Sequence, residues 1–270
     1  MKVALVHDWL TGMRGGEQCL TAFCELFPEA DIYTLLHCEK TVSPLIEKHR
    51  IHTSFIQKLP FSYKKYRYYL PLYPLPITAF DLSGYDLIIS SSHCVAKGVR
   101  VPKGVCHIAY LHTPMRYIWD QYDIYFNQET ASLPVRTAMK MVKPGLRYWD
   151  THSNKGIYAF IANSAFVAAR IKRYYGREAE VIYPPVDFDR FSASSCDDGF
   201  YLMVTAFVPY KRVDLAILAF NQLQRPLTLI GTGPDETRLK NMAGPTITFL
   251  AGQSDPEVVE AYARCSAVIF

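Results

Sequence analysis

The segment AYLHTPMRYIWD, residues 109–120, contains the pattern that the rest of the chain repeats. It runs apolar into His112 and then breaks at Pro114, as a buried strand does where it ends in a polar loop. Open sheets of parallel strands bind their ligands at the carboxyl ends of the strands. By its position alone, His112 is either a hydrogen-bonded structural histidine or a functional one.

Short apolar runs alternate with helical patterns on both sides of this segment. Runs without polar alternation are typical of strands covered on both faces, and crossover helices between them indicate a parallel sheet. The best bounded helix begins after Ser164, a good N-cap, and stops at Gly176. We predict a doubly wound α/β domain over residues 1–183. Its expected strands are 2–9, 30–36, 85–93, 105–113, 158–164 and 179–185, and its expected helices are 15–27 and 165–176.

The same pattern restarts after a break. Residues 184–199 begin with two prolines and end in a polar tail, which indicates an interdomain linker. A parallel sheet that ends on an apolar strand without a covering helix is incomplete, so residues 200–270 are expected to form a partial second α/β domain of a truncated chain. Its expected strands are 200–207, 226–231, 246–252 and 266–270, with helices at 212–223, 236–244 and 256–265.

Composition narrows the class of protein. With 50% hydrophobic and 20% charged residues the chain is typical of a soluble globular enzyme. A net charge of +4 without a long basic block disfavours nucleic acid as a partner. The seven cysteines are scattered and form no C-x-x-C pair, which favours a reducing cytoplasm. No signal peptide or membrane-spanning run is found, so we expect a cytoplasmic protein, with peripheral contact to the plasma membrane left open.

Two loops of the first domain carry candidate binding groups. Gly15 and Gly16 open the first expected helix, where a glycine pair allows close approach of a ligand and free N–H groups can bind a phosphate. A tight turn explains the pair equally well. No G-x-G-x-x-G motif or P-loop occurs, which disfavours nicotinamide and ATP. Beyond His112, polar groups and flat rings suited to a polar, ring-shaped ligand follow at Arg116, Tyr117, Trp119 and Asp120.

Two loops of the second domain indicate an anion site. Lys211 and Arg212 stand at the start of an expected helix, where a cation opposes the helix dipole unless it faces an anion. With free helix N–H groups they would suit a diphosphate, although a solvated basic turn is the alternative. Gly231 and Gly233 lie in the loop after the next strand, at the same sheet edge, and both loops would face the first domain across a cleft. No motif of metal-ligand spacing is present, so no metal is expected.

Residues 58–76 interleave basic and aromatic side chains. Cations beside amphipathic rings suit the headgroup layer of an anionic membrane. A tyrosine-rich helix packed on its own domain is an equal alternative, and nucleic acid is a distant third. The candidate membrane contacts are Lys64, Lys65 and Arg67.

An ordered set of motifs resembles the retaining glycosyltransferases of family 4, which have the GT-B fold of two Rossmann-like doubly wound parallel-sheet domains. The likeness is greatest to the bacterial branch that builds surface polysaccharides and glycolipids and includes mannosyltransferases. The set runs the full length of the chain: RGGE at 14–17, LHTPMRYIWD at 111–120, ANS at 162–164, IYPPVD at 182–187, VPYKRVDLAI at 208–217, GTGP at 231–234 and YARCSAVIF at 262–270.

The resemblance implies roles for these residues. Gly15 and Gly16 would contact the donor phosphate or the acceptor, His112 would hydrogen-bond a hydroxyl of the transferred sugar, and Lys211 would neutralise the leaving diphosphate. Two departures matter. Ala206 stands where many members have an arginine, so Arg212 would replace that cation only in part. The family's E-x7-E glutamates are also absent, so little activity is expected of the chain alone.

The implied reaction is transfer of a sugar, with retention of configuration, from a nucleotide diphosphate sugar to a glycan or lipid-linked oligosaccharide acceptor. GDP-mannose is the donor that the resemblance favours, and no cofactor is expected. Two other functions stay open: a nucleotide-sugar 2-epimerase of the same architecture, and a non-catalytic fragment that binds glycans or membranes.

Overall fold

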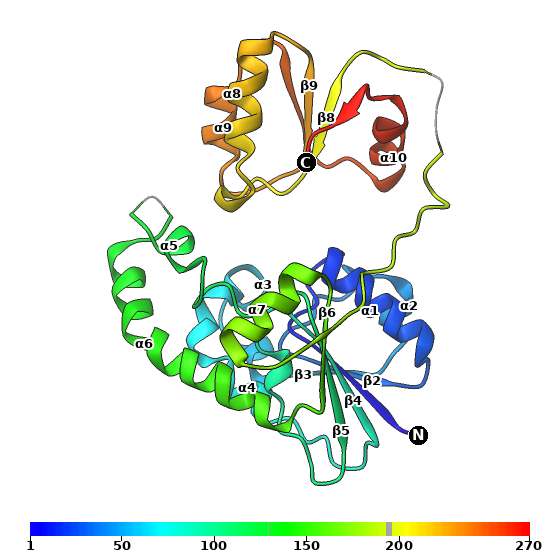
Figure 1. The fold of residues 1–270 in the computed structure, drawn as a ribbon, viewed down its shortest axis with the longest axis vertical. Helices are drawn as coiled ribbons and strands as arrows, with labels where there is room; N and C mark the ends of the chain where they lie inside the picture. The colour runs from blue at the N-terminus through cyan, green and yellow to red at the C-terminus, as the bar shows by residue number, and fades with distance from the viewer. Residues whose placement is uncertain (129, 193–195) are drawn as a thin grey trace. The chain divides into compact units, whose positions relative to one another are not determined.

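The computed structural model describes residues 1–128, 130–192 and 196–270. The chain divides into two compact units, Met1–Pro185 and Val186–Phe270, and each has its own parallel sheet (Figure 1). The α/β class predicted from the alternating pattern is therefore confirmed. Residues 193–195, which belong to the predicted linker 184–199, lie outside the described residues.

The first unit is built on a seven-stranded sheet in the order β3-β2-β1-β4-β5-β6-β7. Every neighbouring pair in it is parallel. The order reverses between β1 and β4, so right-handed crossovers place helices on both faces. The strands are β1 (Val3–His7), β2 (Asp31–Thr34), β3 (Ile51–Thr53), β4 (Leu87–Ser92), β5 (Cys106–Leu111), β6 (Ala159–Ala162) and β7 (Glu180–Val181).

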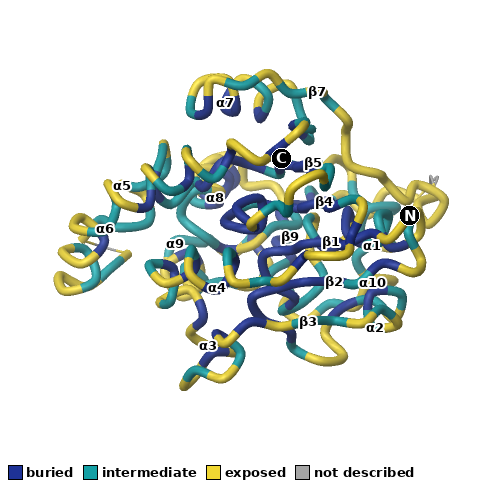
Figure 2. Tube along the Cα trace, turned by 90° about the horizontal axis from the view of Figure 1, so that it is seen from below, coloured by how far each residue is buried: buried dark blue, intermediate teal, exposed yellow. Residues whose placement is uncertain are grey.

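Both faces of this sheet are buried, which explains the runs without polar alternation. In β1, Ala4 and Val6 join one hydrophobic cluster while Val3 and Leu5 join another. Figure 2 shows β1, β2 and β4 as largely buried. Helices α4 (Pro74–Thr78) and α6 (Leu133–His152) contribute to the first cluster, and α1 (Gly15–Leu26) and α2 (Pro44–Glu47) to the second.

Two helices of this unit were predicted and are present. Helix α7 (Ala165–Tyr175) begins as expected, with the Ser164 hydroxyl accepting from the Val167 amide at 3.3 Å, and ends at Gly176 in the left-handed conformation. Helix α1 is the other. The remaining short helices are α3 (Ser62–Lys65) and α5 (Tyr122–Tyr125), and the 3₁₀ turns are η1 (Phe55–Lys58), η2 (Tyr66–Leu72), η3 (Ala96–Gly98) and η4 (Ser153–Gly156).

The sequence pattern did not predict α6, the longest helix, nor the short strand β3. Helix α6 has 20 residues and includes Pro144 and Gly145, which usually end a helix. Its buried side chains Met139 and Leu146 belong to the first hydrophobic cluster, so packing overrides the weak local preference. None of the described helices combines the length and the hydropathy needed to cross a membrane.

The second unit has a four-stranded parallel sheet in the order β10-β9-β8-β11. Its core includes Phe207, Ile217 and Leu229. Each element matches a predicted one: β8 (Tyr201–Val204), α8 (Val213–Leu223), β9 (Leu227–Ile230), α9 (Glu236–Met242), β10 (Ile247–Leu250), α10 (Asp255–Arg264) and β11 (Ala267–Val268). A 3₁₀ turn, η5 (Pro209–Lys211), precedes α8.

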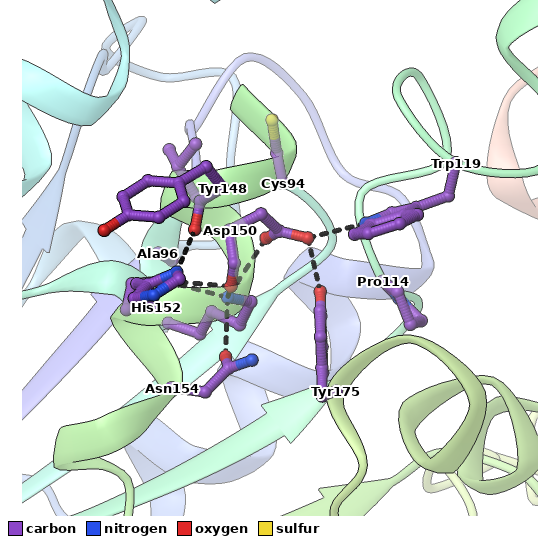
Figure 3. Close-up of polar contacts among 12 residues, drawn as sticks. Cys94, Ala96, Pro114, Trp119, Tyr148, Asp150, His152, Asn154 and Tyr175 are labelled. Atoms are coloured by element: carbon purple, nitrogen blue, oxygen red, sulfur yellow. Dashed lines mark hydrogen bonds and ion pairs between the residues drawn. The ribbon is translucent and has the colours of Figure 1, made fainter. Parts of the chain in front are cut away.

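A buried ion pair ties α6 to the turn after β4 (Figure 3). The Lys97 ammonium lies 3.0 Å from an Asp150 carboxylate oxygen and also donates to the side chains of Ser153 and Asn154. The other Asp150 oxygen accepts from the Trp119 indole at 2.7 Å and from the Tyr175 hydroxyl at 2.9 Å. Burial lowers the pKa of Lys97, and the facing carboxylate opposes that shift.

Because both charges are buried, removing one should be costly. We expect Lys97→Met to lower the free energy of unfolding by about 3–5 kcal/mol, since it leaves the Asp150 charge without its cation. Lys97→Met with Asp150→Asn removes both charges and keeps an acceptor for Trp119 and Tyr175, so most of the loss should return. Urea denaturation at pH 7.5 measures this. Lys172→Met, in the exposed pair with Glu178, is the control and should change little. Equal stability of Lys97→Met and the wild type would contradict the prediction.

Candidate functional site

The candidate site of the first unit lies where the strand order reverses. Strands β1 and β4 are neighbours, and the chain leaves them towards opposite sides of the sheet. In open α/β sheets this switch point leaves a crevice at the carboxyl ends of the strands, where ligands bind. His7 ends β1, Ser91 and Ser92 end β4, and His112 follows β5, so all of these side chains gather at one edge.

The carboxylate of Asp8 shapes this edge. One of its oxygens accepts from the backbone amides of His93 and Cys94 at 2.6 and 2.9 Å, and the other from those of Val95 and Ala96 at 2.6 and 2.7 Å. The His93 ring nitrogen Nδ1 lies 3.1 Å from the same carboxylate. Asp8 is fully buried, so these amides replace its lost hydration. The turn after β4 is thereby held against the end of β1.

His112 belongs to a hydrogen-bonded group beneath Gly16. The Ser91 hydroxyl lies 2.9 Å from His112 Nε2 and 3.1 Å from His7 Nδ1. A Cβ atom on Gly16 would lie 3.4 Å from the His7 ring and 3.7 Å from His112 Nε2. The structure therefore brings Gly16 and His112 together, with the glycine directly over the two imidazoles. A Cβ atom on Gly15 would meet no atom within 4 Å.

Burial keeps two histidines of this edge, His93 and His112, neutral at pH 7. It lowers the pKa of His112 to about 3, with further lowering by the charges of His93 and His7. Burial likewise lowers the pKa of His93 to about 3. At neutral pH His112 therefore forms hydrogen bonds as an uncharged imidazole. It has no proton to give as an imidazolium acid.

The structure places the other predicted residues of the segment in different surroundings. Arg116 is half-buried, and its charge contributes to the low pKa of His93. The Tyr117 ring packs edge-on against the Tyr125 ring, with the two ring centroids 4.8 Å apart. Asp120 forms an ion pair with Arg170 at 2.5 Å. Of the predicted sugar-positioning groups, Asp120 is thus already engaged in holding its own loop to α7.

The sequence analysis missed most partners of His112. Asp8, Glu17, Ser91 and His93 were not singled out, although each lies at or just beyond the end of a strand or in the first turn of α1. The polar residues that follow the apolar runs of β1 and β4 were the available signal, since parallel strands bring their carboxyl ends to one edge. The pairing of Glu17 with His7 had no comparable signal.

In the second unit, the two predicted loops do lie at one sheet edge. The Phe207 amide donates to the Thr232 carbonyl at 2.9 Å, and the Asp235 amide donates to the Phe207 carbonyl at 3.1 Å. A Cβ atom on Gly231 would lie 1.9 Å from the Thr205 carbonyl oxygen, and one on Gly233 would lie 2.1 Å from that of Phe207. Both glycines are therefore required for the close approach of the loops.

The two predicted cations of this edge differ. Arg212 precedes α8 in the left-handed conformation and pairs with Asp214 through two contacts of 3.1 Å. The anion that it faces is therefore in its own helix. Lys211 is exposed and forms no ion pair with a carboxylate of the described residues. The cleft between these loops and the first unit stays a prediction.

Residues 58–76 divide into a buried and an exposed side. Tyr66, Leu70 and Tyr73 belong to the core, which fits the alternative of a tyrosine-rich segment packed on its own domain. The exposed side carries rings and cations together, and we call it the 58–76 surface. Its members are Phe61, Tyr63, Lys64, Lys65, Arg67 and Tyr68, with Phe61 72% and Tyr68 68% exposed.

Comparison with known proteins decides the family. The model of Glycosyltransferase Family 4 matches residues 13–190. The chain belongs to glycosyltransferase family 4. A search of curated proteins gives no match.

Solved structures share the GT-B fold of this glycosyltransferase. HepE of Anabaena in complex with UDP has 16% identity and a TM-score of 0.63, over 99% of this chain and 73% of HepE. Sucrose-phosphate synthase of Thermosynechococcus elongatus has 14% identity and a TM-score of 0.65, over 99% of this chain and 75% of the synthase. At such low identity the similarity establishes the fold alone.

Neutral buried histidines should make the glycosyltransferase less stable in mild acid. Burial lowers the pKa of the fully buried His107 to about 3, against about 6.5 in an unfolded chain. Between these values the unfolded state binds more protons, so stability falls as the pH falls. From pH 7.5 to 5.5 we expect a loss of about 1 kcal/mol for such a histidine. Urea denaturation at both pH values measures the free energy of unfolding. Between pH 7.5 and 5.5, His107→Gln should lose about 1 kcal/mol less of it than the wild type. An identical loss in both proteins would refute the assignment.

Proposed function

We propose that this protein transfers a hexose from a nucleotide diphosphate sugar to a hydroxyl of a glycan or lipid-linked acceptor, with retention of configuration, in the synthesis of surface polysaccharides. The observation that carries the proposal is the neutral imidazole of His112 at the switch-point edge, beneath Gly16. Gly16 leaves the backbone of α1 close to this imidazole. A polar ligand that enters the edge can therefore meet both.

His112 acts in this proposal as a positioning group. Its pKa of about 3 leaves it uncharged at neutral pH, so it hydrogen-bonds a hydroxyl of the transferred sugar. Arg116 and Tyr117 lie in the following loop and complete the sugar-side lining. Asp120 contributes through Arg170, by keeping that loop in place.

Lys211 acts on the leaving group. In the proposed reaction the bond between the sugar C1 and the diphosphate oxygen breaks, and the acceptor oxygen bonds C1 on the same face. The acceptor proton passes to the departing diphosphate, whose negative charge Lys211 stabilises electrostatically. Arg212, already paired with Asp214, adds less. We propose that this reaction needs neither a divalent ion nor a cofactor, so that a chelator leaves it unchanged.

The donor base is a separate question. The motif resemblance favours GDP-mannose. Structures of HepE with UDP and with UDP and glucose support a UDP-sugar as the second donor to test.

Calorimetric titration of the protein with GDP, UDP and ADP tests the donor site. We expect one base to bind, and Lys211→Ala to weaken its binding roughly tenfold or more, because a charge-assisted contact to the diphosphate is lost. Lys240→Ala is the matched control, since Lys240 lies near the end of α9 and pairs with Glu236 at 2.7 Å. Unchanged binding by Lys211→Ala would place the diphosphate elsewhere. No binding of any nucleotide would favour a non-catalytic glycan-binding or membrane-binding protein.

The 2-epimerase alternative differs in its need for an acceptor. An epimerase converts the nucleotide sugar by itself, whereas a transferase releases nucleoside diphosphate in step with a glycosylated product. Incubation of the bound nucleotide sugar with and without a lipid-linked acceptor, followed by mass spectrometry, separates the two reactions. A rearranged sugar without acceptor would replace our proposal by the epimerase.

We also propose that the 58–76 surface contacts an anionic membrane on its cytoplasmic side, where a lipid-linked acceptor would lie. The supporting observation is the exposure of Phe61, Tyr63 and Tyr68 beside Lys64 and Lys65. Aromatic rings of this kind sit at the headgroup level, and each nearby cation adds about 1 kcal/mol of attraction to anionic lipid.

Flotation with vesicles that contain anionic lipid tests the membrane contact. We expect the wild type to float and Lys64→Glu with Lys65→Glu to stay largely in the soluble fraction. The control, Lys103→Glu with Lys155→Glu, changes the net charge equally at exposed positions that precede β5 and β6, at the opposite edge of the sheet. Equal flotation of both double variants would rule out contact through the 58–76 surface.

A further inference from the structure

The outward side of α6 is apolar. Figure 1 shows this helix along the outside of the first unit, and its buried residues, Met139, Leu146 and Asp150, all lie on one side of it. Surface helices normally turn polar and charged residues to the opposite side. On α6 that side instead carries exposed apolar residues, which we call the outer face of α6: Leu133 (69% exposed), Pro134, Ala138, Met141 (76%), Pro144, Gly145 and Tyr148 (66%).

Two exposed polar side chains on the same side are bonded to the helix itself. The Thr137 hydroxyl donates to the Leu133 carbonyl at 3.0 Å. His152 Nδ1 lies 2.8 Å from the Tyr148 carbonyl, and the His152 ring stacks on the Tyr148 ring with centroids 3.8 Å apart. Because both side chains already have a partner in α6, the outer face can be covered without leaving them unsatisfied.

A row of cations runs along one flank of the outer face. Its members stand four, three and four residues apart, a spacing that brings side chains to one line of a helix: Arg136, Lys140, Lys143 and Arg147. Asp150 is the only acidic residue in the sequence of α6, and it is buried and paired with Lys97. Like charges at these spacings repel one another, so the row is unfavourable to α6 unless it faces an anion.

The cations of this row differ in their surroundings. The Lys143 ammonium lies 3.6 Å from the centroid of the Tyr122 ring, and the Arg147 guanidinium donates to the Ile118 carbonyl at 2.6 Å. These two cations therefore also hold the segment between β5 and α6. Lys140 is the exposed member of the row and directly precedes Met141 of the outer face.

We propose that α6 lies on an anionic membrane surface, with its outer face at the headgroup level and its cation row against the lipid phosphates. An apolar face flanked by Lys and Arg is the arrangement of helices that lie in the membrane interface. Tyrosine, here Tyr148, is enriched at this level because its ring is apolar and its hydroxyl polar. Helix α6 packs against η2, which carries part of the 58–76 surface. The inference rests on the proposed membrane contact for its partner and adds a second element to it.

Flotation of the pure protein with vesicles of phosphatidylglycerol and phosphatidylcholine tests the outer face. We expect Tyr148→Glu to lower the partition coefficient roughly tenfold, because it replaces an apolar contact by a charge that anionic lipid repels. The matched control is Tyr158→Glu, which makes the same change at a 78% exposed ring before β6 and should float like the wild type. Met141→Glu should also lose binding, whereas Met141→Leu should keep it. Equal flotation of Tyr148→Glu and Tyr158→Glu would overturn the proposal.

The cation row predicts a dependence on lipid charge. Lys140→Gln should lower partition onto the anionic vesicles roughly fivefold, because it removes one cation from the membrane surface. Lys103→Gln, at an exposed position before β5, changes the net charge equally and should have no effect. On vesicles of phosphatidylcholine alone, the wild type and both variants should bind weakly and alike. Equal binding of the two variants to anionic vesicles would exclude the cation row from the contact.

The outcomes separate this inference from the proposals that precede it. If Tyr148→Glu floats like the wild type while Lys64→Glu with Lys65→Glu does not, contact through the 58–76 surface stands and α6 is excluded. A dimer in the ultracentrifuge that Tyr148→Glu abolishes, without any flotation of the wild type, would assign the outer face to a second copy of the chain and overturn the proposal. Tyr148→Glu should bind nucleotides like the wild type, so a failure of nucleotide binding counts against the transferase function alone.

Discussion

The carboxylate of Asp8 is the constraint on which the first unit depends. It is fully buried just after β1 and accepts hydrogen bonds from the backbone amides of residues 93–96, which follow β4. It therefore joins the ends of the two strands between which the sheet order reverses. A buried carboxylate without such donors would be very unfavourable, and the turn without the carboxylate would leave buried amides unsatisfied. Each side therefore requires the other. The same turn continues into Lys97, whose pairing with Asp150 fastens α6, so one polar framework connects the switch point to the longest helix.

The two units build their strand-end loops in different ways. In the first unit, buried side chains reach across the edge: Asp8 to the following turn, and Ser91 to both His7 and His112. In the second unit, backbone meets backbone, because Gly231 and Gly233 allow carbonyl groups to approach within distances that any Cβ would block. Side-chain networks orient a particular imidazole, whereas the glycine-lined loop brings main chain to the edge, where Lys211 is exposed. The proposed function assigns the first kind of surface to the sugar and the second to the diphosphate.

The family match covers residues 13–190, which lie mostly in the first unit, and solved GT-B structures resemble the chain at only 14–16% identity. His112, His93 and His7 form a cluster of rings at this edge, in which burial and mutual repulsion keep His93 and His112 neutral. A neutral imidazole is suited to hydrogen bonding a sugar, and that role does not require a shift of its pKa towards neutrality.

The sequence by itself predicted every described strand except β3, and it placed His112 at a strand end, because apolar runs and the polar residues that follow them are local signals. It also brought the Lys211 and Gly231 loops to one edge, since neighbouring parallel strands align their carboxyl ends. It did not predict α6, which includes Pro144 and Gly145 and is stabilised by side chains such as Met139 that are buried in the hydrophobic core. Nor did it assign Asp120 to Arg170, Arg212 to Asp214, or Glu17, His7 and Ser91 to His112. Only the tertiary structure decided these partners, because a buried polar group must find a donor or acceptor wherever the folded chain brings one, at any separation in the sequence.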